Sequence, residues 1–303
     1  MNNIKDKIIG SMVAIATPMN ENDEVDYQAL EKLLEFHIKN KTDVIVSVGT
    51  TGESATLDFS EHEKVIKTTI DIINGRVPVI AGTGANSTSE AIELTRKARD
   101  IGADACLLVT PYYNKPTQNG LYEHYMKIAD TVDIPQILYN VPGRTSLDML
   151  PDTVLKLSNH ENIIGIKEAS GSEERSRELL KKCSHNISII SGDDKTSMRD
   201  MLMGFKGNIS VTANVAPNQM HLMCKHAING DKNKAEEINN QVDILHDKLF
   251  LESNPIPVKW VLQKLGLIGK GIRLPLTQLD EQYHDEIMNA IKSSKLRENN
   301  IYD

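Results

Sequence analysis

The sequence predicts an α/β protein, a (β/α)8 TIM barrel followed by a C-terminal helical region. Short runs rich in β-branched residues recur eight times over roughly 220 residues, separated by stretches with helical periodicity. A doubly wound open sheet is the alternative, but that architecture usually has fewer units and a glycine-rich first turn. Neither "GTTGES" (49–54) nor "GTGAN" (82–86) has the spacing of a dinucleotide-binding or phosphate-binding loop. We therefore expect the barrel.

The eight predicted strands are short apolar runs that end in turn residues. They span 11–18, 43–50, 77–84, 105–111, 134–140, 163–169, 187–194 and 207–214. Two of the intervening helices carry clear boundary signals. Residues 60–73 have apolar side chains at helical spacing and an S-x-x-E capping box of Ser60 and Glu63. Residues 87–102 end at Gly102, which we expect to be the C-cap.

The strand pattern stops after the eighth run, and helical patterns follow. They cover residues 218–250, 255–267 and 280–300. We therefore predict a barrel domain over 1–223, with its active site at the C-terminal ends of the strands, and a C-terminal helical domain over 224–303 that packs against it.

Composition and charge exclude several classes of protein. The chain has 303 residues, 40% of them hydrophobic and 25% charged, and a net charge of −8, which argues against a nucleic-acid or acidic-membrane partner. Cys106, Cys183 and Cys224 are too few and too scattered for a disulfide framework, so we expect a cytoplasmic protein. The apolar stretch 8–13 is too short for a signal peptide, and no run reaches the roughly 18 apolar residues of a membrane span.

Lys167 lies inside the apolar run "IIGIKEAS" (163–170), where an ammonium group is poorly hydrated. Strand alternation places Lys167 on the face of Gly165 and Ala169, which we expect to point into the barrel. The opposite face would hold Ile164, Ile166 and Glu168. Burial disfavours the charged form of a lysine, and the neutral amine is a nucleophile that forms Schiff bases with carbonyls. A structural lysine paired with a carboxylate is the alternative, and periodicity alone leaves both interpretations open.

Hydroxyl groups and one guanidinium gather at the ends of other predicted strands. These are Thr50, Thr51, Tyr112, Tyr113, Tyr139 and Arg144. Hydroxyls can shuttle protons during the formation and dehydration of a carbinolamine, and Arg144 can bind a carboxylate with two parallel hydrogen bonds. Each residue alone has an ordinary structural explanation. Together they predict a site for a small keto acid.

Six motifs in chain order resemble the 4-hydroxy-tetrahydrodipicolinate synthase family, also called the dihydrodipicolinate synthases. They are "GTTGESATL", "TPYYNKPTQ", "YNVPGRT", "GIKEASG", "SGDD" and "NPIPVKW", and the resemblance covers about residues 8–280. The lysine motif is shared with other pyruvate-dependent aldolases and lyases, including N-acetylneuraminate lyase, whereas "PYYN" and "YNVPGRT" are more specific to the synthases. The resemblance implies that pyruvate and L-aspartate 4-semialdehyde condense through a Schiff base on Lys167. The product would be 4-hydroxy-tetrahydrodipicolinate, an intermediate in lysine and diaminopimelate biosynthesis.

The resemblance also implies roles for individual residues. Tyr139, Thr50 and Tyr113 would form a proton relay, with Tyr113 reaching in from a neighbouring subunit. Thr51, Gly192 and Ile209 would line the pyruvate site, and Arg144 would hold the carboxylate of the second substrate. No metal or cofactor is implied, and family members are commonly homotetramers built as dimers of dimers.

A regulatory pocket for lysine at a subunit interface is a further implication of the resemblance. Its residues would be Ser54, Ala55, His62, Asn86, Glu90 and Tyr112. Phe59 departs from the family pattern, because lysine-sensitive bacterial members have histidine at this position. We therefore expect weakened inhibition by lysine, with complete insensitivity as the alternative.

Three alternatives concern function. A different pyruvate-lysine aldolase, such as a sugar-acid lyase, would need a longer acceptor pocket than Arg144 and Tyr113 suggest. A catalytically silent barrel would be expected to lack the lysine or the relay, both of which are present. "HLMCKH" (221–226) places His221, Cys224 and His226 close enough to bind a metal, but on a predicted helix far from the strand ends.

Overall fold

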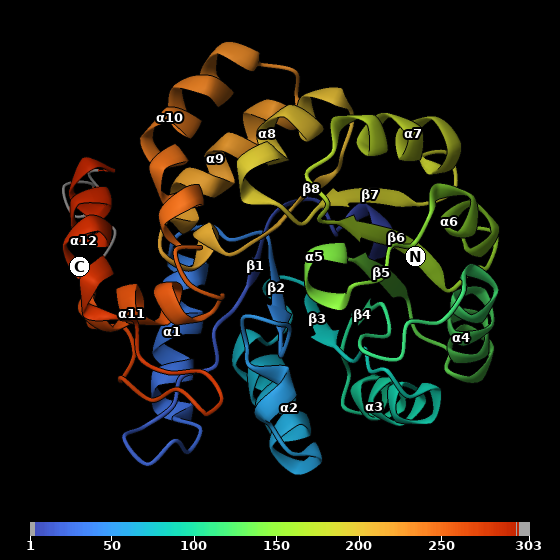
Figure 1. The fold of residues 1–303 in the computed structure, drawn as a ribbon, viewed down its shortest axis with the longest axis horizontal. Helices are drawn as coiled ribbons and strands as arrows, with labels where there is room; N and C mark the ends of the chain where they lie inside the picture. The colour runs from blue at the N-terminus through green and yellow to red at the C-terminus, as the bar shows by residue number, and fades with distance from the viewer. Residues whose placement is uncertain (1–3, 295, 297–303) are drawn as a thin grey trace.

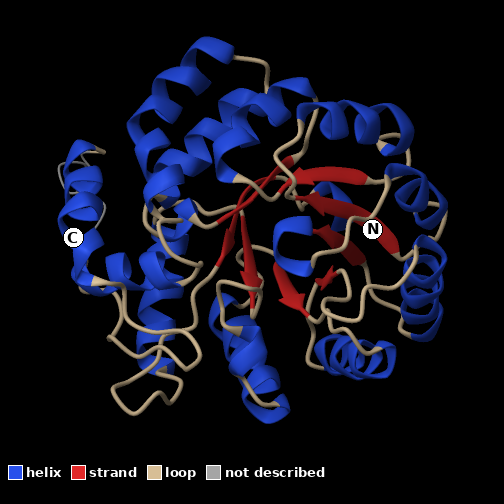
Figure 2. Cartoon of the chain, viewed as in Figure 1, coloured by secondary structure: helices blue, strands red, loops and turns tan. Residues whose placement is uncertain are grey.

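A computed structural model of the protein describes residues 4–294 and 296, and it contains a closed barrel of eight parallel strands (Figures 1 and 2). The strands are β1 (Gly10–Ala14), β2 (Val44–Ser47), β3 (Val79–Gly82), β4 (Ala105–Val109), β5 (Gln136–Asn140), β6 (Ile163–Glu168), β7 (Ser188–Ser191) and β8 (Gly207–Ser210). Each strand pairs with the next, and β8 closes on β1. The predicted fold class is confirmed.

Helices surround the barrel and continue beyond it at the C-terminal end (Figure 1). They are α1 (Tyr27–Lys39), α2 (Phe59–Ile73), α3 (Thr88–Asp100), α4 (Gln118–Thr131), α5 (Pro142–Thr145), α6 (Pro151–Leu157), α7 (Glu173–Cys183), α8 (Asp194–Met203), α9 (Pro217–Ile228), α10 (Lys232–Lys248), α11 (Ile256–Lys264) and α12 (His284–Ser293). Short 3-10 turns occupy Ile4–Asp6, Ser54–Thr56, Thr212–Asn214 and Glu281–Tyr283.

Most strands end several residues before the predicted runs do. β1 ends at Ala14 and β2 at Ser47, although the β-branched pattern continues to residues 18 and 50. The residues that follow each strand form the loops at one rim of the barrel. Val48 shows why the pattern misleads: this β-branched residue has φ of +55°, which no strand can accommodate.

Two apolar clusters divide the core. The inner cluster fills the barrel and includes Met12, Val46, Ile80, Leu107, Ile137, Tyr139, Ile190 and Ile209, whereas the outer cluster lies between strands and helices. Ile166 belongs to the outer cluster and Ala169 packs against the inner one, as strand alternation predicts. The prediction for Ile164 is wrong: it packs against the inner cluster. The pairing of β5 with β6 skips Ile164, and this irregularity reverses the local alternation.

Two predicted helix boundaries need correction. The capping box of α2 is formed by Asp58 and Glu61 rather than by Ser60 and Glu63: Asp58 accepts hydrogen bonds from the backbone N–H groups of residues 60 and 61. A D-x-x-E pattern caps a helix as well as S-x-x-E does, and here it occurs two residues earlier. Gly102 is not the C-cap of α3 but lies one residue beyond it, with φ of +92°.

The C-terminal helices pack on the barrel. α9 contacts β1 and α8, and α10 contacts both α8 and α9. The predicted division after residue 223 falls inside α9, whereas residues 229–231 lie between α9 and α10. The predicted helix 280–300 begins as a 3-10 turn and continues as α12; its last part lies outside the described residues. No helix in the described part of the chain is long and apolar enough to cross a membrane.

We expect His37 to make stability depend on pH. It is fully buried on α1, and burial lowers its pKa from 6.5 to about 3. The unfolded chain therefore gains a proton near pH 6.5 that the folded chain does not accept until about pH 3, so the free energy of unfolding falls as pH drops through this window. His37→Gln should weaken this dependence by up to about 1.4 kcal/mol per pH unit in urea denaturation. The same change at the exposed His185 should leave it intact, and equal slopes for the two variants would contradict the account.

Candidate active site

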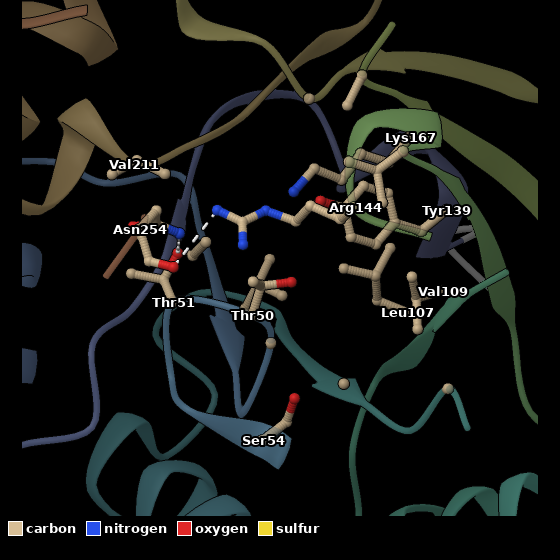
Figure 3. A pocket seen from close by; sticks show the side chains of 18 of the residues that line it. Thr50, Thr51, Ser54, Leu107, Val109, Tyr139, Arg144, Lys167, Val211 and Asn254 are labelled. Carbon is tan, nitrogen blue, oxygen red and sulfur yellow. Dashed lines mark hydrogen bonds between the residues drawn. The ribbon is translucent and has the colours of Figure 1, made fainter. Parts of the chain in front are cut away.

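A cavity of about 180 Å³ opens at the C-terminal ends of the strands (Figure 3). Its walls combine polar side chains with the apolar residues of the upper barrel. Among the lining residues are Thr50, Thr51, Leu107, Val109, Tyr139, Arg144, Lys167, Gly192, Asp193, Val211, Phe250 and Asn254. In a barrel of this kind the strand C-termini form the active face. The cavity is therefore the candidate active site.

Lys167 enters this cavity from β6. Its side chain is 6% exposed, and its Nζ atom lies 4.2 Å from the centre of the Tyr139 ring. The two residues are direct neighbours in the pairing of β5 with β6. Among the side chains that the structure describes, no carboxylate lies within ion-pair distance of Lys167. Glu168 points away and contacts Arg175 instead. The carboxylate-paired alternative therefore does not describe Lys167.

Lys259 is the buried lysine that does fit that alternative, and sequence reasoning missed it. It lies on α11, is 4% exposed, and forms an ion pair with the buried Glu53. Desolvation lowers the pKa of Lys259, while the charge of Glu53 opposes the shift. The only signal in the sequence was the motif "NPIPVKW", which does not reveal the partner.

The loop after β2 carries Thr50 and Thr51 in a strained backbone. Val48 and Glu53 have φ of +55° and +57°, a region that costs energy for residues other than glycine. The C-terminal region holds the loop in place: Lys259 pairs with Glu53, and the backbone N–H of Arg273 donates to the same carboxylate at 3.1 Å. The side-chain amide of Asn254 donates to the Thr51 hydroxyl at 3.0 Å.

Arg144 lies at the mouth of the cavity. It comes from the short helix α5, which begins at Pro142 directly after β5. Figure 3 shows its guanidinium reaching across the cavity toward Thr51 and Asn254, and Nη2 donates to the backbone oxygen of Asn254 at 3.3 Å. The remaining donors of the guanidinium give the cavity a fork suited to a carboxylate.

The predicted site residues do not all meet in this cavity. Lys167, Tyr139, Thr50, Thr51, Arg144 and Gly192 line it together. Ile209 is buried in the inner cluster beneath the cavity and is not among the lining residues. Tyr113 lies on the surface of its own chain, 90% exposed, with φ of +74°. Sequence reasoning missed Phe250 and Val211, which have no chemical signal beyond apolar character.

A second cavity of about 470 Å³ adjoins the first and shares Thr50 and Arg144 with it. It brings together five of the six predicted regulatory residues: Ser54, Ala55, His62, Glu90 and Tyr112. The sixth, Asn86, contacts this group through a hydrogen bond to the backbone oxygen of Tyr112. Burial lowers the pKa of His62 to about 4. Phe59 is 42% exposed and lies outside the lining, 5.6 Å beneath the Lys97 ammonium.

The residues of "HLMCKH" point to separate partners. His221 Nδ1 lies 3.0 Å from Asp43, whereas His226 Nδ1 lies 3.3 Å from Asp231. Cys224 is buried, and desolvation raises the pKa of its thiol. Within the described residues, no group of three or more histidine, cysteine or acidic side chains is arranged to hold a metal ion.

Residues 7–294 match the Dihydrodipicolinate synthetase family. The chain belongs to this family. It is 59% identical to the 4-hydroxy-tetrahydrodipicolinate synthase of Thioalkalivibrio sulfidiphilus, over 94% of this chain and 97% of that protein. Its structure resembles the chloride-inhibited dihydrodipicolinate synthase of Acinetobacter baumannii complexed with pyruvate, with a TM-score of 0.95, 55% identity, and coverage of 95% of this chain and 99% of the other. A lysine-bound synthase from Cyanidioschyzon merolae is also similar, with a TM-score of 0.91, 37% identity, and coverage of 95% and 99%.

We expect Lys259→Met to destabilise the protein strongly, because it leaves the buried Glu53 carboxylate without its cation. The free energy of unfolding should fall by roughly 3–5 kcal/mol in chemical denaturation. The double variant Glu53→Gln/Lys259→Met should lose less, since it removes both charges. Lys67→Met breaks the exposed pair with Asp71 and should cost no more than about 0.5 kcal/mol. A Lys259→Met variant as stable as Lys67→Met would show that the buried pair does not hold the loop.

Proposed function

We propose that this chain condenses pyruvate with L-aspartate 4-semialdehyde to give 4-hydroxy-tetrahydrodipicolinate, for lysine and diaminopimelate biosynthesis. The observation that carries the proposal is Lys167, a buried amine at the end of β6 that opens into the cavity and has no carboxylate partner among the residues that the structure describes. The names of the most similar relatives and the pyruvate complex of the Acinetobacter enzyme support the same reaction.

The reaction would proceed through covalent intermediates on Lys167. Its neutral amine attacks the keto carbon of pyruvate, and the keto oxygen leaves as water to give an imine. Loss of a methyl proton forms an enamine. The enamine carbon attacks the aldehyde carbon of the second substrate, and the aldehyde oxygen takes up a proton. The amino group of that substrate then replaces Lys167 at the imine carbon, which closes the ring and frees the lysine.

The other residues of the cavity would bind the substrates and move protons. Tyr139 and Thr50 line the cavity that the Lys167 amine enters and would relay protons during dehydration. Arg144, at the mouth, would hold the carboxylate of the second substrate. Thr51 and Gly192 would contact pyruvate. Ile209, in the inner cluster beneath the cavity, would form part of the floor of the pyruvate site. No step requires a metal or an organic cofactor.

Tyr113 would complete the relay of a neighbouring subunit. A tyrosine with φ of +74° and 90% exposure is costly for an isolated chain, and such strain is often found where a residue serves a site. Its exposure also excludes it from the cavity of its own chain. We therefore propose that the protein assembles as a homotetramer, a dimer of dimers in which Tyr113 is exchanged between paired subunits.

The second cavity would bind lysine as a feedback inhibitor. Glu90 offers a carboxylate to an ammonium group, and Tyr112 and His62 offer further polar contacts. Phe59 lies outside the lining, one turn before His62 on α2, and its ring offers no hydrogen bond, so binding would be weak.

Complementation tests the reaction and the exchange of Tyr113 together. The unmodified chain should form product from pyruvate and L-aspartate 4-semialdehyde, whereas Lys167→Ala and Tyr113→Phe should each be severely impaired. Co-expression of the two variants should restore about a quarter of full activity, because half of randomly formed dimers are mixed and each contains one complete site. No product from the unmodified chain would refute the function, and no recovery on co-expression would refute the exchange alone.

Gly192→Ala should inactivate the site without unfolding the protein. A β-carbon at this position would lie 2.6 Å from Cε of Lys167 and 2.9 Å from Cγ, so the lysine must move. We expect kcat to fall by about 100-fold, as is typical when a reacting group is displaced by about 1 Å. At Gly143 a β-carbon would meet nothing within 4 Å. Gly143→Ala should therefore keep its activity, and an active Gly192→Ala variant would contradict the placement of Lys167.

Lysine titration tests the regulatory proposal. Activity should decline weakly at millimolar lysine, and Phe59→His should lower the concentration needed for half inhibition by about 10-fold, as one hydrogen bond to a charged ligand allows. The variant Phe59→Leu provides the control, because it changes the ring without adding a polar contact. Lysine without effect on the unmodified chain would remove the proposal.

A further inference from the structure

The residues that follow Tyr139 and Lys167 form a polar network on the outer side of the barrel. β5 and β6 pair Tyr139 with Lys167 and, one step on, Asn140 with Glu168. Because side chains alternate along a strand, the first pair faces the cavity and the second faces outward. The outward pair therefore lies directly behind the two residues that carry the chemistry.

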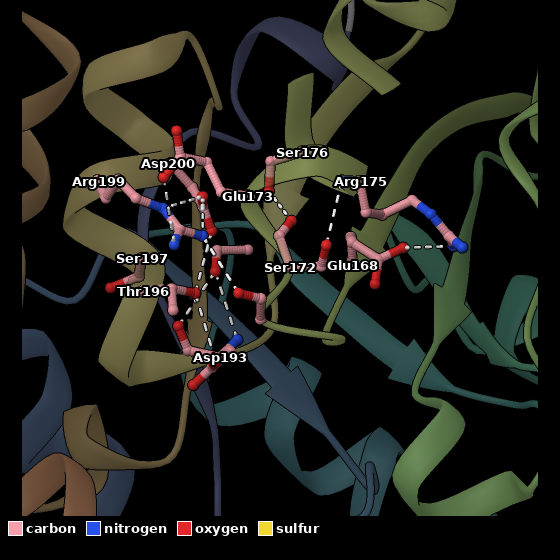
Figure 4. Close-up of polar contacts among 12 residues, drawn as sticks. Glu168, Ser172, Glu173, Arg175, Ser176, Asp193, Thr196, Ser197, Arg199 and Asp200 are labelled. Atoms are coloured by element: carbon pink, nitrogen blue, oxygen red, sulfur yellow. Dashed lines mark hydrogen bonds and ion pairs between the residues drawn. The ribbon is translucent and has the colours of Figure 1, made fainter. Parts of the chain in front are cut away.

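The Asn140 side chain makes three hydrogen bonds, which use both amide hydrogens and one lone pair of the oxygen. Nδ2 donates to Glu168 at 3.1 Å and to Asp148 at 2.9 Å, and Oδ1 accepts from the backbone N–H of Met149 at 2.9 Å. Arg175 closes the network, with two hydrogen bonds to Asp148 at 2.9 and 2.6 Å and one nitrogen 3.7 Å from Glu168. Figure 4 shows Glu168 turned toward Arg175 and away from the second polar group around Asp193.

The network is buried where it meets the strands. Asn140 is fully buried and Glu168 is 4% exposed. Burial raises the pKa of Glu168, and hydrogen bonds from Asn140 and Ser170 oppose the shift. A carboxylate in such a position depends on its partners, because an unpaired buried charge is costly. The geometry of Glu168 is therefore fixed on both sides, by Asn140 on β5 and by Arg175 on α7.

Backbone hydrogen bonds connect this pair to a third site residue. The N–H of Gly192 donates to the backbone oxygen of Glu168 at 2.8 Å, and the N–H of Ala169 donates to that of Asn140 at 3.0 Å. Gly192 is the residue whose missing side chain makes room for Lys167. β6 also contains the irregularity at Ile164, three residues before Lys167. An irregular register can redirect the side chains that follow it along the strand. Contacts outside the strand pairing therefore help to fix the direction of Lys167.

We propose that Glu168 and Asn140 are positioning residues, which hold the Lys167 amine over the Tyr139 ring by joining β5 to β6 behind the cavity. The inference rests on the proposed function, in which Lys167 forms the Schiff base. The two residues touch no substrate. They act through the adjoining residues of their own strands, so their loss should affect turnover more than the binding of pyruvate.

Glu168→Gln tests this inference, with Asp148→Asn as its matched control. In Glu168→Gln one acceptor oxygen becomes an NH2 donor, so either Asn140 or the backbone N–H of Ser170 loses its acceptor. Asp148→Asn disturbs the same two partners, Asn140 and Arg175, but Asp148 belongs to the loop between α5 and α6 rather than to a strand. The exchange of pyruvate methyl protons with D₂O, followed by NMR, reports enamine formation without the second substrate. Steady-state kinetics with both substrates gives kcat and KM.

We expect Glu168→Gln to lower the exchange rate and kcat by about 10-fold or more while KM for pyruvate changes by less than about 3-fold. Asp148→Asn should change kcat by less than about 2-fold, although we expect denaturation to show that both variants are destabilised. Should Glu168→Gln fail to fold, Asn140→Ser removes the same contact from β5 and should give the same pattern. Equal losses of kcat in the strand and loop variants, or none in either, would overturn the inference. Absence of exchange in the unmodified chain would instead overturn the proposed function, and the inference with it.

Discussion

The proposed chemistry depends on a buried amine, Lys167, that has no counter-charge within the part of the chain that the structure describes. Lys167 is 6% exposed at the end of β6, and its Nζ atom lies 4.2 Å from the centre of the Tyr139 ring. Lys259 is buried to a similar degree, but its charge is balanced by a direct ion pair with Glu53. Among the described residues Lys167 and Lys259 are the buried lysines, and only Lys259 has a carboxylate partner.

The closed barrel and the C-terminal helices contribute to the cavity in different ways. The barrel brings Lys167, Tyr139 and Gly192 to one rim through parallel pairing. The loop with Thr50 and Thr51 has an unfavourable backbone at two positions, and contacts from α11 and from Arg273 hold it against the cavity. The helical region is thus part of the active-site framework. The same loop also borders the second cavity, which gives a ligand there a direct physical path to Thr50.

Local patterns in the sequence were sufficient for the fold and for most of the candidate site. Strand runs and helical spacing identified all eight strands, and alternation gave the inward direction of Lys167. Patterns failed where a contact joins distant residues: Glu53 and Lys259 are 206 positions apart, and the motif around each residue does not reveal its partner. Alternation failed at Ile164, because the register of β6 is set by its neighbour β5. The role of Tyr113 stays a proposal, because it concerns a surface that only a second subunit could cover.

The most direct test of the account is to locate a covalent adduct. The protein is incubated with pyruvate, reduced with borohydride and analysed by intact mass spectrometry and peptide mapping. The account predicts one stable pyruvate-derived group per chain, on the peptide that contains Lys167, and none on the equally buried Lys259. Lys167→Ala should show no adduct. An adduct on another lysine, or no adduct on the unmodified chain, would contradict the account and make Lys167 a structural residue.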